Sequence, residues 1–269
     1  TEFELIARYF TRRGSSALLG NGDDCAIVAP GAGTAFAVTT DTLIEGRHFR
    51  LDWSTPEQVG RKAIAQNAAD IESMGARVTG FVVAFGAPGE TPAAMVAELS
   101  DGMWAEAAAV DAGIVGGDLV ASPQWVVSVT ALGDLGGREP VLRSGARPGS
   151  LIAVAGELGR SAAGFQLWRN GLDDVADLRA RHLVPRPPYG QGRTAAEAGA
   201  QAMTDVSDGL LADLGHMASA SGGVIDLRRV ALREDVDAVS PAAAAAGVDP
   251  WSLVLGGGED HALVACFPD

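Results

Sequence analysis

The sequence predicts a two-domain chain of the mixed α/β class. Its 269 residues exceed the usual size of one domain, which is about 100–200 residues. Hydrophobic residues make up 47% of the chain and charged residues 20%, which is the composition of a globular protein. Segments with strand and helix patterns alternate, and glycine, proline and arginine cluster over 133–150. We therefore expect one domain over residues 1–137 and a second over residues 138–269.

The N-terminal half alternates strand and helix signals. Residues 34–41, TAFAVTTD, alternate apolar and small polar side chains up to a carboxylate, which predicts a strand that ends in a loop. Residues 55–57 combine an N-cap, a proline at the first helical position and an early acid, so a helix should begin there and end at Gly75. The further elements expected in this half are a buried strand over 81–86, a helix over 91–110 and a strand over 124–133.

The C-terminal half shows a similar alternation. The turn MTDVSDG over 203–209 opens a helix. The segment HALVACF over 261–267 predicts a strand, and because a strand rarely ends a domain uncovered, we expect further residues beyond Asp269. The other expected elements are a strand over 151–156, a helix over 161–171, a proline-rich loop over 186–193, a short helix over 194–203, a helix over 210–221 and a strand over 224–227.

The charge balance argues against polyanionic partners. Thirty-four acidic against 20 basic residues give a net charge of −14 at pH 7, which repels a nucleic-acid backbone or an anionic membrane. No apolar run reaches the roughly 18 residues that would span a bilayer. Cys25 and Cys266 lie far apart without a CxxC motif, so we expect neither a disulfide scaffold nor a cysteine-rich zinc site. A reducing, cytoplasmic location is the default expectation.

Aspartates recur beside glycine, serine or threonine in short polar segments. Any one of them is commonly a turn or N-cap residue. If their carboxylates converge, two unit charges 4 Å apart repel by roughly 4 kcal/mol at an effective dielectric near 20, so arginines or divalent cations must hold them. Mg2+ commonly bridges carboxylates to phosphates, which favours a magnesium–phosphate site. Asp70 differs because it lies within a predicted helix, on the face that carries Asn67. The segments are 20–24, 39–42, 116–118, 204–209 and 256–260.

The familiar nucleotide-binding signatures are absent from the sequence. A Walker A loop requires G-x-x-x-x-G-K-[ST], whereas Lys62, the single lysine, follows Arg61 in a predicted helix. Neither the H-R-D loop of protein kinases nor a G-x-G-x-x-G turn occurs. If the chain uses ATP, metal ions and main-chain amides must therefore hold it. The absence of G-x-S-x-G and H-E-x-x-H leaves serine-triad and zinc-hydrolase chemistry without support.

Arg143 and the four histidines leave alternatives open. Arg143 could contact a phosphate or base directly, or cap a surface loop. His48 could touch a phosphate or lie exposed. His182 and His216 fit surface or packing positions, and His261 fits a strand position.

Eight segments, taken in order and at their spacings, resemble the thiamine-monophosphate kinase family. They are NGDDCAIV, TTDTLIEGRHF, KAIAQNAADIESMGA, GGD, LRSGARPGS, AGELGRSAAG, TDVSDGLLADLGHMASASGG and GGGEDHALV, and the match covers nearly the whole chain. The resemblance implies the two-domain fold of the aminoimidazole-ribonucleotide synthetase-like superfamily, with N-terminal domains that pair in a homodimer and an active site near that interface. It also implies that the γ-phosphoryl of ATP moves directly onto thiamine monophosphate, giving thiamine diphosphate and ADP.

The same resemblance implies roles for individual residues, none of which becomes phosphorylated. Phosphoryl transfer requires mainly alignment and charge neutralisation, which several metal ions supply. Gly117, Asp118, Arg143 and Ser207 would contact ATP, and His48 and Glu259 would contact the thiamine phosphate. The Mg2+ ligands would be Asp24, Thr39, Thr40, Asp41, Asp70, Asp118, Asp205 and Asp208.

The chain departs from the family pattern in three places. NAAD over 67–70 stands where the family usually has NLSD, and GGEDHA over 257–262 stands where it has GGEDYE. Both departures keep the implied ligands Asp70 and Glu259. The family also continues beyond the position of Asp269 and supplies an aromatic residue that stacks on the substrate, so we expect that residue outside the given sequence.

Other members of the superfamily and a non-catalytic binder are the alternatives. Aminoimidazole-ribonucleotide synthetase is the nearest ATP-using competitor. Selenophosphate synthetase usually carries a reactive cysteine or selenocysteine and a lysine near its N-terminus, which TEFELIARYFTRRGSS lacks. Hydrogenase-maturation relatives end in a reactive cysteine tail, which the given sequence does not show. A protein that only binds nucleotide or metal would need fewer carboxylates than those matched here.

Overall fold

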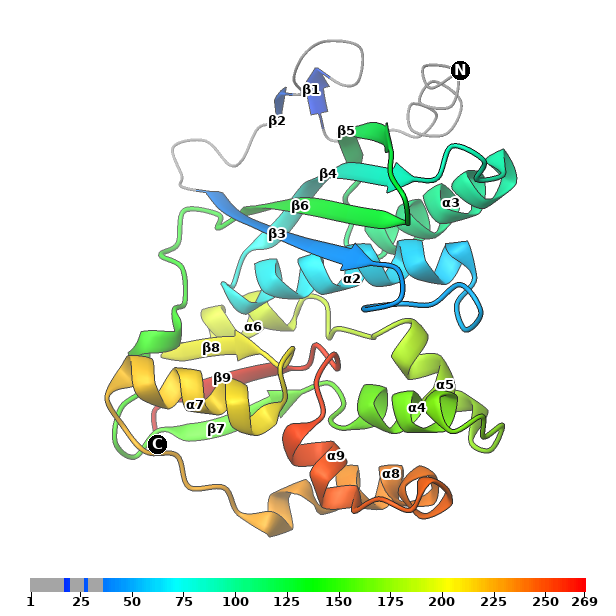
Figure 1. Cartoon of the computed structure of the whole chain (residues 1–269). Helices are drawn as coiled ribbons and strands as arrows, with labels where there is room; N and C mark the ends of the chain where they lie inside the picture. Colours follow the sequence, from blue (N-terminus) through cyan, green and yellow to red (C-terminus); the bar gives the residue numbers. More distant parts are fainter. Residues whose placement is uncertain (1–16, 20–26, 29–35) are drawn as a thin grey trace. The chain divides into compact units, whose positions relative to one another are not determined.

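The computed structural model describes residues 17–19, 27–28 and 36–269 of the chain (Figure 1). Asp24, one of the expected magnesium ligands, lies outside these described residues. The chain divides into two compact units, each described by itself below. The first contains the chain up to Ile71 together with Ala76–Glu139, and the second contains Glu72–Gly75 and Pro140–Asp269.

A four-stranded sheet forms the centre of the first unit. Its strands lie in the order β3-β6-β4-β5, with β3 and β4 antiparallel to β6, and β5 parallel to β4. Helices α2 and α3 pack against one face of this sheet (Figure 1). A separate antiparallel pair joins β1 and β2. The bounds are β1 Ala17–Leu19, β2 Ile27–Val28, β3 Phe36–Ile44, α2 Pro56–Ser73, β4 Arg77–Ala87, α3 Ala93–Ala109, β5 Ile114–Ala121 and β6 Val126–Asp134.

Helix α2 begins where the sequence predicts it. The Thr55 hydroxyl accepts a hydrogen bond from the Gln58 amide at 3.2 Å, and the Gln58 side chain accepts one from the Thr55 amide at 2.9 Å. This reciprocal capping box satisfies two main-chain donors that the first turn leaves without helical partners. After the helix, Gly75 adopts a φ of +73°, which confirms it as the terminating glycine.

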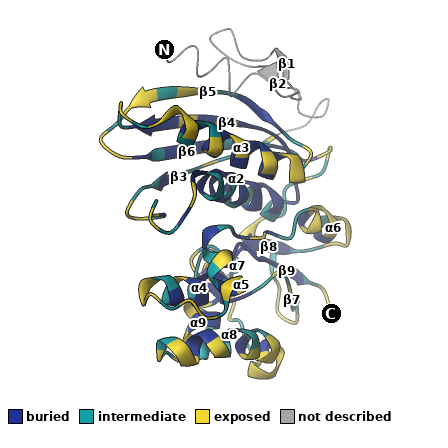
Figure 2. Cartoon of the chain, turned by 90° about the vertical axis from the view of Figure 1, so that its right-hand side faces the viewer, coloured by how far each residue is buried: buried dark blue, intermediate teal, exposed yellow. Residues whose placement is uncertain are grey.

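The face of this sheet opposite the two helices exposes apolar side chains. Side chains alternate between the faces of a strand, and on β3 every second residue points away from the helices. On that face Phe36 is 54% exposed and Val38 is 59% exposed, and Val120 on β5 is 52% exposed. Figure 2 shows exposed residues on β5. The first unit therefore carries an apolar sheet surface that no described element covers.

A three-stranded antiparallel sheet in the order β7-β9-β8 organises the second unit. Six helices and two 3-10 turns surround it (Figure 1). Its core gathers buried apolar side chains from the sheet and the helices, among them Leu167, Leu210 and Val239. The bounds are η1 Arg143–Gly145, β7 Leu151–Ala155, α4 Arg160–Arg169, α5 Ala176–Leu183, α6 Gln191–Glu197, β8 Ala202–Asp205, α7 Leu210–Ser221, η2 Arg229–Leu232, α8 Arg233–Ala246, α9 Pro250–Gly256 and β9 Leu263–Phe267.

Two expectations about strands are wrong. The strand that was expected to stop at Asp41 continues to Ile44, so Asp41 lies inside β3 and pairs with Val129. Segment 224–227 is not a strand. It follows two glycines, and its apolar residues Ile225 and Leu227 pack directly on the core of the second unit without pairing with the sheet.

Sheets with packed helices in both units confirm the mixed α/β class. The described helices include none that is both long enough and apolar enough to cross a membrane. The helix expected over 194–203 is wrong in its second half, because α6 ends at Glu197 and strand β8 begins at Ala202. Strands β1, β2, β5 and β8 and helices α8 and α9 are elements that the sequence patterns did not predict.

Candidate metal and phosphate site

A group of oxygen-bearing side chains lies between β3 and α2 in the first unit. The Thr39 hydroxyl donates a hydrogen bond to Asp70 Oδ2 at 2.7 Å. The main-chain amide of Asp41 donates to Asn67 Oδ1 at 3.1 Å, and Asn67 Nδ2 donates to the carbonyl of Ala63 at 2.8 Å. Thr39 and Asp41 share a strand face, so the strand and the helix present Asp41 and Asp70 to the same region.

Thr40 does not share that face. Its hydroxyl donates to the carbonyl of Val129 at 3.0 Å and accepts from the Thr130 hydroxyl at 3.2 Å. Because strand side chains alternate, the three consecutive expected ligands cannot all point to one place. The structure groups Thr39 with Asp41 and separates the Thr40 hydroxyl from both.

Asp118 lies on the face of the same sheet opposite the two helices. Asp118 on β5 pairs with Ala84 on β4, and Ala84 pairs with Ser128 on β6. Ser128 in turn pairs with Thr42 on β3. Two strands separate β5 from β3, which corresponds to roughly 14 Å at about 4.8 Å per strand. Within this unit, therefore, Asp118 does not join the group formed by Asp41 and Asp70.

Gly117, the residue before Asp118, stands where the chain has no room for a side chain. A Cβ at this position would overlap the carbonyl oxygen of Val83 on the neighbouring strand. Asp118 itself accepts a hydrogen bond from the amide of Leu119 at 3.0 Å. The GGD segment is therefore a close approach of two strands that ends in an exposed carboxylate.

His48 belongs to a tight loop at the end of β3. Its Nδ1 accepts a hydrogen bond from the Ile44 amide at 3.0 Å, so the proton of the neutral ring lies on Nε2. The buried Lys62 donates to the carbonyl of His48 at 3.1 Å. The ring is half-buried and held in one orientation, with Nε2 as the atom directed away from the loop amide.

In the second unit, carboxylates gather where β8 ends and α7 begins. Asp205, the last residue of β8, is only 3% exposed, and its Oδ2 lies 3.0 Å from Nδ1 of His261. Asp213, in the first turn of α7, is 1% exposed and accepts the amide of Asp208 at 3.1 Å. Ligand atoms of Asp208, Asp213 and His216 all lie within 4.8 Å of one another, so these side chains could share one cation.

The pKa of Asp213 reflects its burial and how close the carboxylates of this second group lie to one another. Burial raises the pKa of the Asp213 carboxyl above its ordinary value, and the charges of Asp205 and Asp208 raise it further. The pattern of the sequence had singled out Asp205 and Asp208 but not Asp213. The signal that could have found it is its position five residues after Asp208, in the turn of helix that the aspartate-rich loop opens.

The loop that carries Glu259 is locked onto the loop that carries Ser207. The amide of Glu259 donates to the carbonyl of Ser207 at 2.8 Å, and the amide of His261 donates to the carbonyl of Val206 at 2.9 Å. A Cβ on Gly258 would lie 2.5 Å from the Ser207 carbonyl oxygen. The glycines of GGGED therefore allow two backbones to approach closely, and they fix Ser207 and Glu259 relative to each other.

Asp260 anchors this loop from the other side. Its carboxylate accepts the amide of Gly159 at 2.5 Å and the amide of Ser161 at 2.8 Å, which caps the N-terminus of α4. Burial raises the pKa of Asp260 to about 7, against the lowering effect of these hydrogen bonds. Asp260 was not among the expected site residues, because its partners lie about a hundred residues earlier in the chain.

Glu259 and Arg143 complete the expected set in this unit. Glu259 is half-buried, and its carboxylate lies 3.7 Å from Nδ1 of His182. Arg143, in η1, donates from Nε to the Thr204 hydroxyl at 3.1 Å, while its carbonyl accepts from the Ser221 hydroxyl at 3.0 Å. The exposed guanidinium therefore lies beside the strand that ends in Asp205.

The donor chemistry of both groups fits magnesium. Mg2+ selects hard oxygen ligands and usually takes one or two carboxylates together with water or phosphate oxygens. In the first unit the oxygen donors are Asp41, Asp70 and the Thr39 hydroxyl. In the second unit they are Asp205, Asp208 and Asp213.

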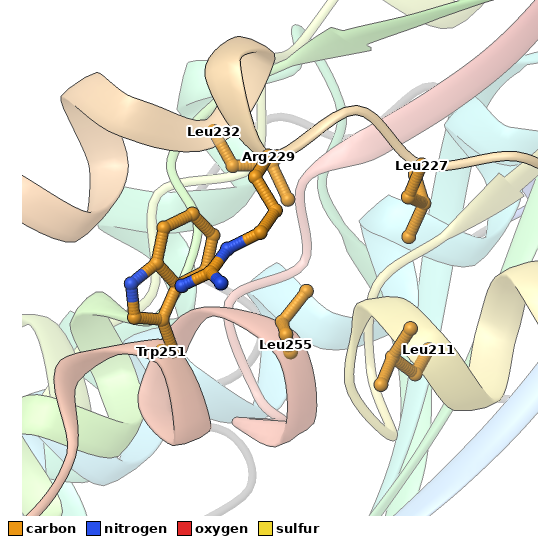
Figure 3. Close-up of a pocket in the computed structure, with 6 residues that line it drawn as sticks. All are labelled: Leu211, Leu227, Arg229, Leu232, Trp251 and Leu255. Atoms are coloured by element: carbon orange, nitrogen blue, oxygen red, sulfur yellow. The ribbon is translucent and has the colours of Figure 1, made fainter.

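A pocket of about 280 Å³ on the second unit has different chemistry. Its walls are apolar apart from Arg229, whose guanidinium lies over the Trp251 ring at 4.2 Å from the ring centroid. Figure 3 shows Arg229 extended across the indole, with Leu211 and Leu255 on the other side of the pocket. None of the expected site residues lines it, and it offers no oxygen ligands for a metal.

Comparisons with known proteins agree along nearly the whole chain. The family model for AIR synthase related protein, N-terminal domain, matches residues 22–135, and that for the C-terminal domain matches residues 147–261. A thiamine-monophosphate kinase from Mycobacterium tuberculosis is 66% identical over 99% of this chain and 80% of the relative.

Two solved structures extend the comparison to the fold. The thiamine-monophosphate kinase from Stenotrophomonas maltophilia K279a matches with a TM-score of 0.78 and 33% identity, over 99% of this chain and 84% of that one. AaThiL complexed with AMPPCP and TMP matches with a TM-score of 0.73 and 26% identity, over 99% of this chain and 84% of that one. The fold, both domain matches and the 66% identity together show that this chain belongs to the thiamine-monophosphate kinase family of AIR synthase related proteins.

Proposed function

We propose that this chain transfers the γ-phosphoryl group of ATP to thiamine monophosphate, giving thiamine diphosphate and ADP. The observation that carries the proposal is that this chain is 66% identical to a thiamine-monophosphate kinase. Two groups of hard oxygen donors in this chain agree with that reaction. The related structure complexed with AMPPCP, an ATP analogue, and TMP supports the same pair of substrates.

Magnesium is the metal that these donors favour. We assign its ligands to Asp41, Asp70 and Thr39 in the first unit and to Asp205 and Asp208 in the second, with Asp24, Thr40 and Asp118 as further expected ligands. Bound Mg2+ would supply charge neutralisation to the phosphates of both substrates. Because the Thr40 hydroxyl bonds to Val129 and Thr130, only the family resemblance supports Thr40 as a ligand.

The polar groups beside these ligands suit the phosphates and the substrate. Arg143 can present its guanidinium to an ATP phosphate, while Ser207, Gly117 and Asp118 are the other expected ATP contacts. His48 and Glu259 are the expected contacts to the thiamine phosphate. Nε2 of His48 carries the proton that such a contact needs, because Nδ1 already accepts the Ile44 amide.

Direct transfer between the two substrates requires no nucleophile from the protein. Phosphoryl transfer depends mainly on in-line alignment and on stabilising charge on the transferred group. The chain contributes orientation: Thr39 fixes Asp70, Asn67 fixes the backbone at Asp41, and the interlocked loops fix Ser207 and Glu259. The terminal phosphate oxygen of thiamine monophosphate is then the attacking group.

We propose a homodimer formed through the sheet face opposite α2 and α3 in the first unit, in the domain that spans residues 1–137. That face exposes Phe36 and Val38 on β3 and Val120 on β5, at the two edges of one sheet. Exposed apolar patches of this kind commonly mark protein–protein interfaces. Asp118 lies on the same face, so pairing through it would bring this carboxylate to the interface.

A coupled assay of ADP release tests the proposed reaction. We expect ADP release with ATP, Mg2+ and thiamine monophosphate, and no release when aminoimidazole precursors replace thiamine monophosphate. Mass spectrometry of the product should show thiamine diphosphate. Turnover of the aminoimidazole precursor would assign the chain to another member of the superfamily.

A non-catalytic binder is the alternative from a different class. Calorimetry would then show uptake of Mg2+–ATP, with no consumption of ATP after addition of thiamine monophosphate. The number of oxygen donors kept on both units favours turnover over binding alone.

A further inference from the structure

His261 is held in an unusual and fully enclosed position. It is 6% exposed and adopts a φ of +53°, a left-handed conformation that is uncommon for residues other than glycine. Its amide donates to the carbonyl of Val206, and the residue before it, Asp260, caps helix α4. The backbone on both sides of the histidine is therefore fixed, and so is the direction of the ring.

The ring is directed at one carboxylate. Nδ1 of His261 lies 3.0 Å from Oδ2 of Asp205, and both side chains are buried. An ionised carboxylate can only accept hydrogen bonds, so Nδ1 must carry the proton in this contact. The two residues are 56 positions apart, and the pair forms because the GGGED loop is locked onto the end of β8.

The contact occupies one oxygen of Asp205 and sets the rotation of the carboxylate. Metal-ligating carboxylates are commonly held in this way by an outer hydrogen bond, and loss of the outer partner typically weakens metal affinity by about 10–100-fold. Asp205 is otherwise a buried charge at the end of a strand, beside Asp208 and Asp213. With Oδ2 held by His261, Oδ1 is the carboxylate oxygen left for a cation.

We propose that His261 is a positioning residue for the metal site of the second unit, and that its Nδ1–H orients Asp205 so that the other carboxylate oxygen binds the cation. The proposal rests on the proposed function, in which Asp205 is a magnesium ligand. In this role His261 acts on the cation through Asp205 and not by direct contact. Its effect is on metal affinity, which separates it from a histidine that only fills space in the core.

Two substitutions, to residues that readily adopt the left-handed backbone, test whether the Nδ1–H donor of His261 is required. His261→Gly removes the ring and its donor, whereas His261→Asn keeps an amide nitrogen at nearly the position of Nδ1. We expect the dissociation constant for Mn2+, measured on the free protein by EPR, to rise about 10–100-fold in His261→Gly. His261→Asn should restore the dissociation constant to within about threefold of the wild type, a small difference for a retained hydrogen bond.

Folding and metal affinity are measured on the same samples. Both variants lose buried ring contacts and should unfold at lower temperature than the wild type. A His261→Gly variant that is folded and binds Mn2+ as the wild type does would overturn the proposal. So would an equal loss of Mn2+ affinity in both variants, because a lost donor could not then be the cause.

A measurement on the wild type keeps the proposal testable if His261→Gly does not fold. The chain has only four histidines, so 15N-histidine labelling gives a spectrum simple enough to assign. We expect His261 to be protonated at Nδ1 and its ring signals to shift when Mg2+ is added. A His261 ring without a proton on Nδ1, or signals unchanged at saturating Mg2+, would overturn the proposal.

A third variant separates this inference from the proposed function. Asp205→Asn should lose Mn2+ affinity at least as strongly as His261→Gly. If Asp205→Asn binds Mn2+ normally, Asp205 is not a ligand and the assignment made under the proposed function fails. If Asp205→Asn loses the metal while His261→Gly keeps it, only the positioning role of His261 fails.

Discussion

The two carboxylate groups of this chain are built by different means. In the first unit, Asp41 and Asp70 stand on a strand and a helix, and the neutral side chains of Thr39 and Asn67 orient them. In the second unit, Asp205 ends a strand and the loop after it carries the next carboxylate, locked by backbone hydrogen bonds to the GGGED loop. Regular elements position the first group through their periodicity, and close backbone contact positions the second.

Burial differs between the groups as well. Asp41 and Asp70 are half-buried, whereas in the second group Asp205 and Asp213 are buried and only Asp208 is exposed. The pKa of Asp213 is raised by burial and by its acidic neighbours. The first group can therefore be changed with little effect on folding, while changes at Asp205 or Asp213 should alter folding and metal affinity together.

The largest expected effect is on the activity of Asp41→Asn. The substitution removes an anionic ligand, and we expect the turnover rate to fall by more than the roughly 10–100-fold that loss of an outer partner causes. The fold should survive, because the contact to Asn67 uses the main-chain amide of residue 41. The ADP-release assay and a thermal unfolding curve measure the two effects.

Asp101→Asn is the matched control for that experiment. Asp101 is an exposed aspartate on α3 of the same unit, away from the oxygen group, so its replacement should leave the turnover rate near that of the wild type. Near-normal activity in Asp41→Asn would show that Asp41 does not bind the metal. An equal loss in Asp101→Asn would show that the assay reports net charge and not ligation.

The next effect is a pH dependence of stability that originates in the second unit. Burial raises the pKa of Asp260 from 3.8 to about 7, so the folded state holds the proton more tightly than the unfolded state does. The stabilisation is complete below about pH 4 and is lost as the pH rises toward about 7. The free energy of unfolding should fall by about 1.4 kcal/mol per pH unit in this window, or about 4 kcal/mol in total.

Denaturant unfolding between pH 4 and pH 8 measures the slope of the free energy of unfolding against pH. Asp260→Asn cannot titrate, so its slope should be shallower than that of the wild type, although it loses part of the cap on α4. Burial also raises the pKa of Glu72, Asp213 and Asp235, and these groups contribute to the slope in the same direction. Identical slopes in the wild type and the variant would remove Asp260 as a source of the pH dependence.

Local signals in the sequence predicted much of the fold. The N-cap at Thr55 and the turn before α7 depend on neighbouring residues, and both appear where the sequence indicates. The strand expected over 224–227 fails because β propensity depends on a partner strand, and these residues pack on the core instead.

The candidate site could be predicted only in part. Residue types and family resemblance indicated Asp41, Asp70, Asp205 and Asp208. The pairs that orient these residues could not be read from the sequence, because the contact between Asp205 and His261 spans 56 positions and depends on how two loops interlock. The list of expected ligands placed Thr39 and Thr40 together, although strand periodicity directs these two neighbouring side chains to opposite faces.

The smallest effect concerns the backbone contact that distinguishes the second unit. A Cβ on Gly258 would lie 2.5 Å from the Ser207 carbonyl oxygen, so Gly258→Ala must push the two loops apart, at a cost of about 1–3 kcal/mol of folding free energy. Gly256→Ala is the matched control, since a Cβ there meets nothing within 4 Å. Urea unfolding should show a lower midpoint for Gly258→Ala only. Equal midpoints in the two variants would mean that the loops can separate without cost, and the second group would then be no more dependent on backbone packing than the first.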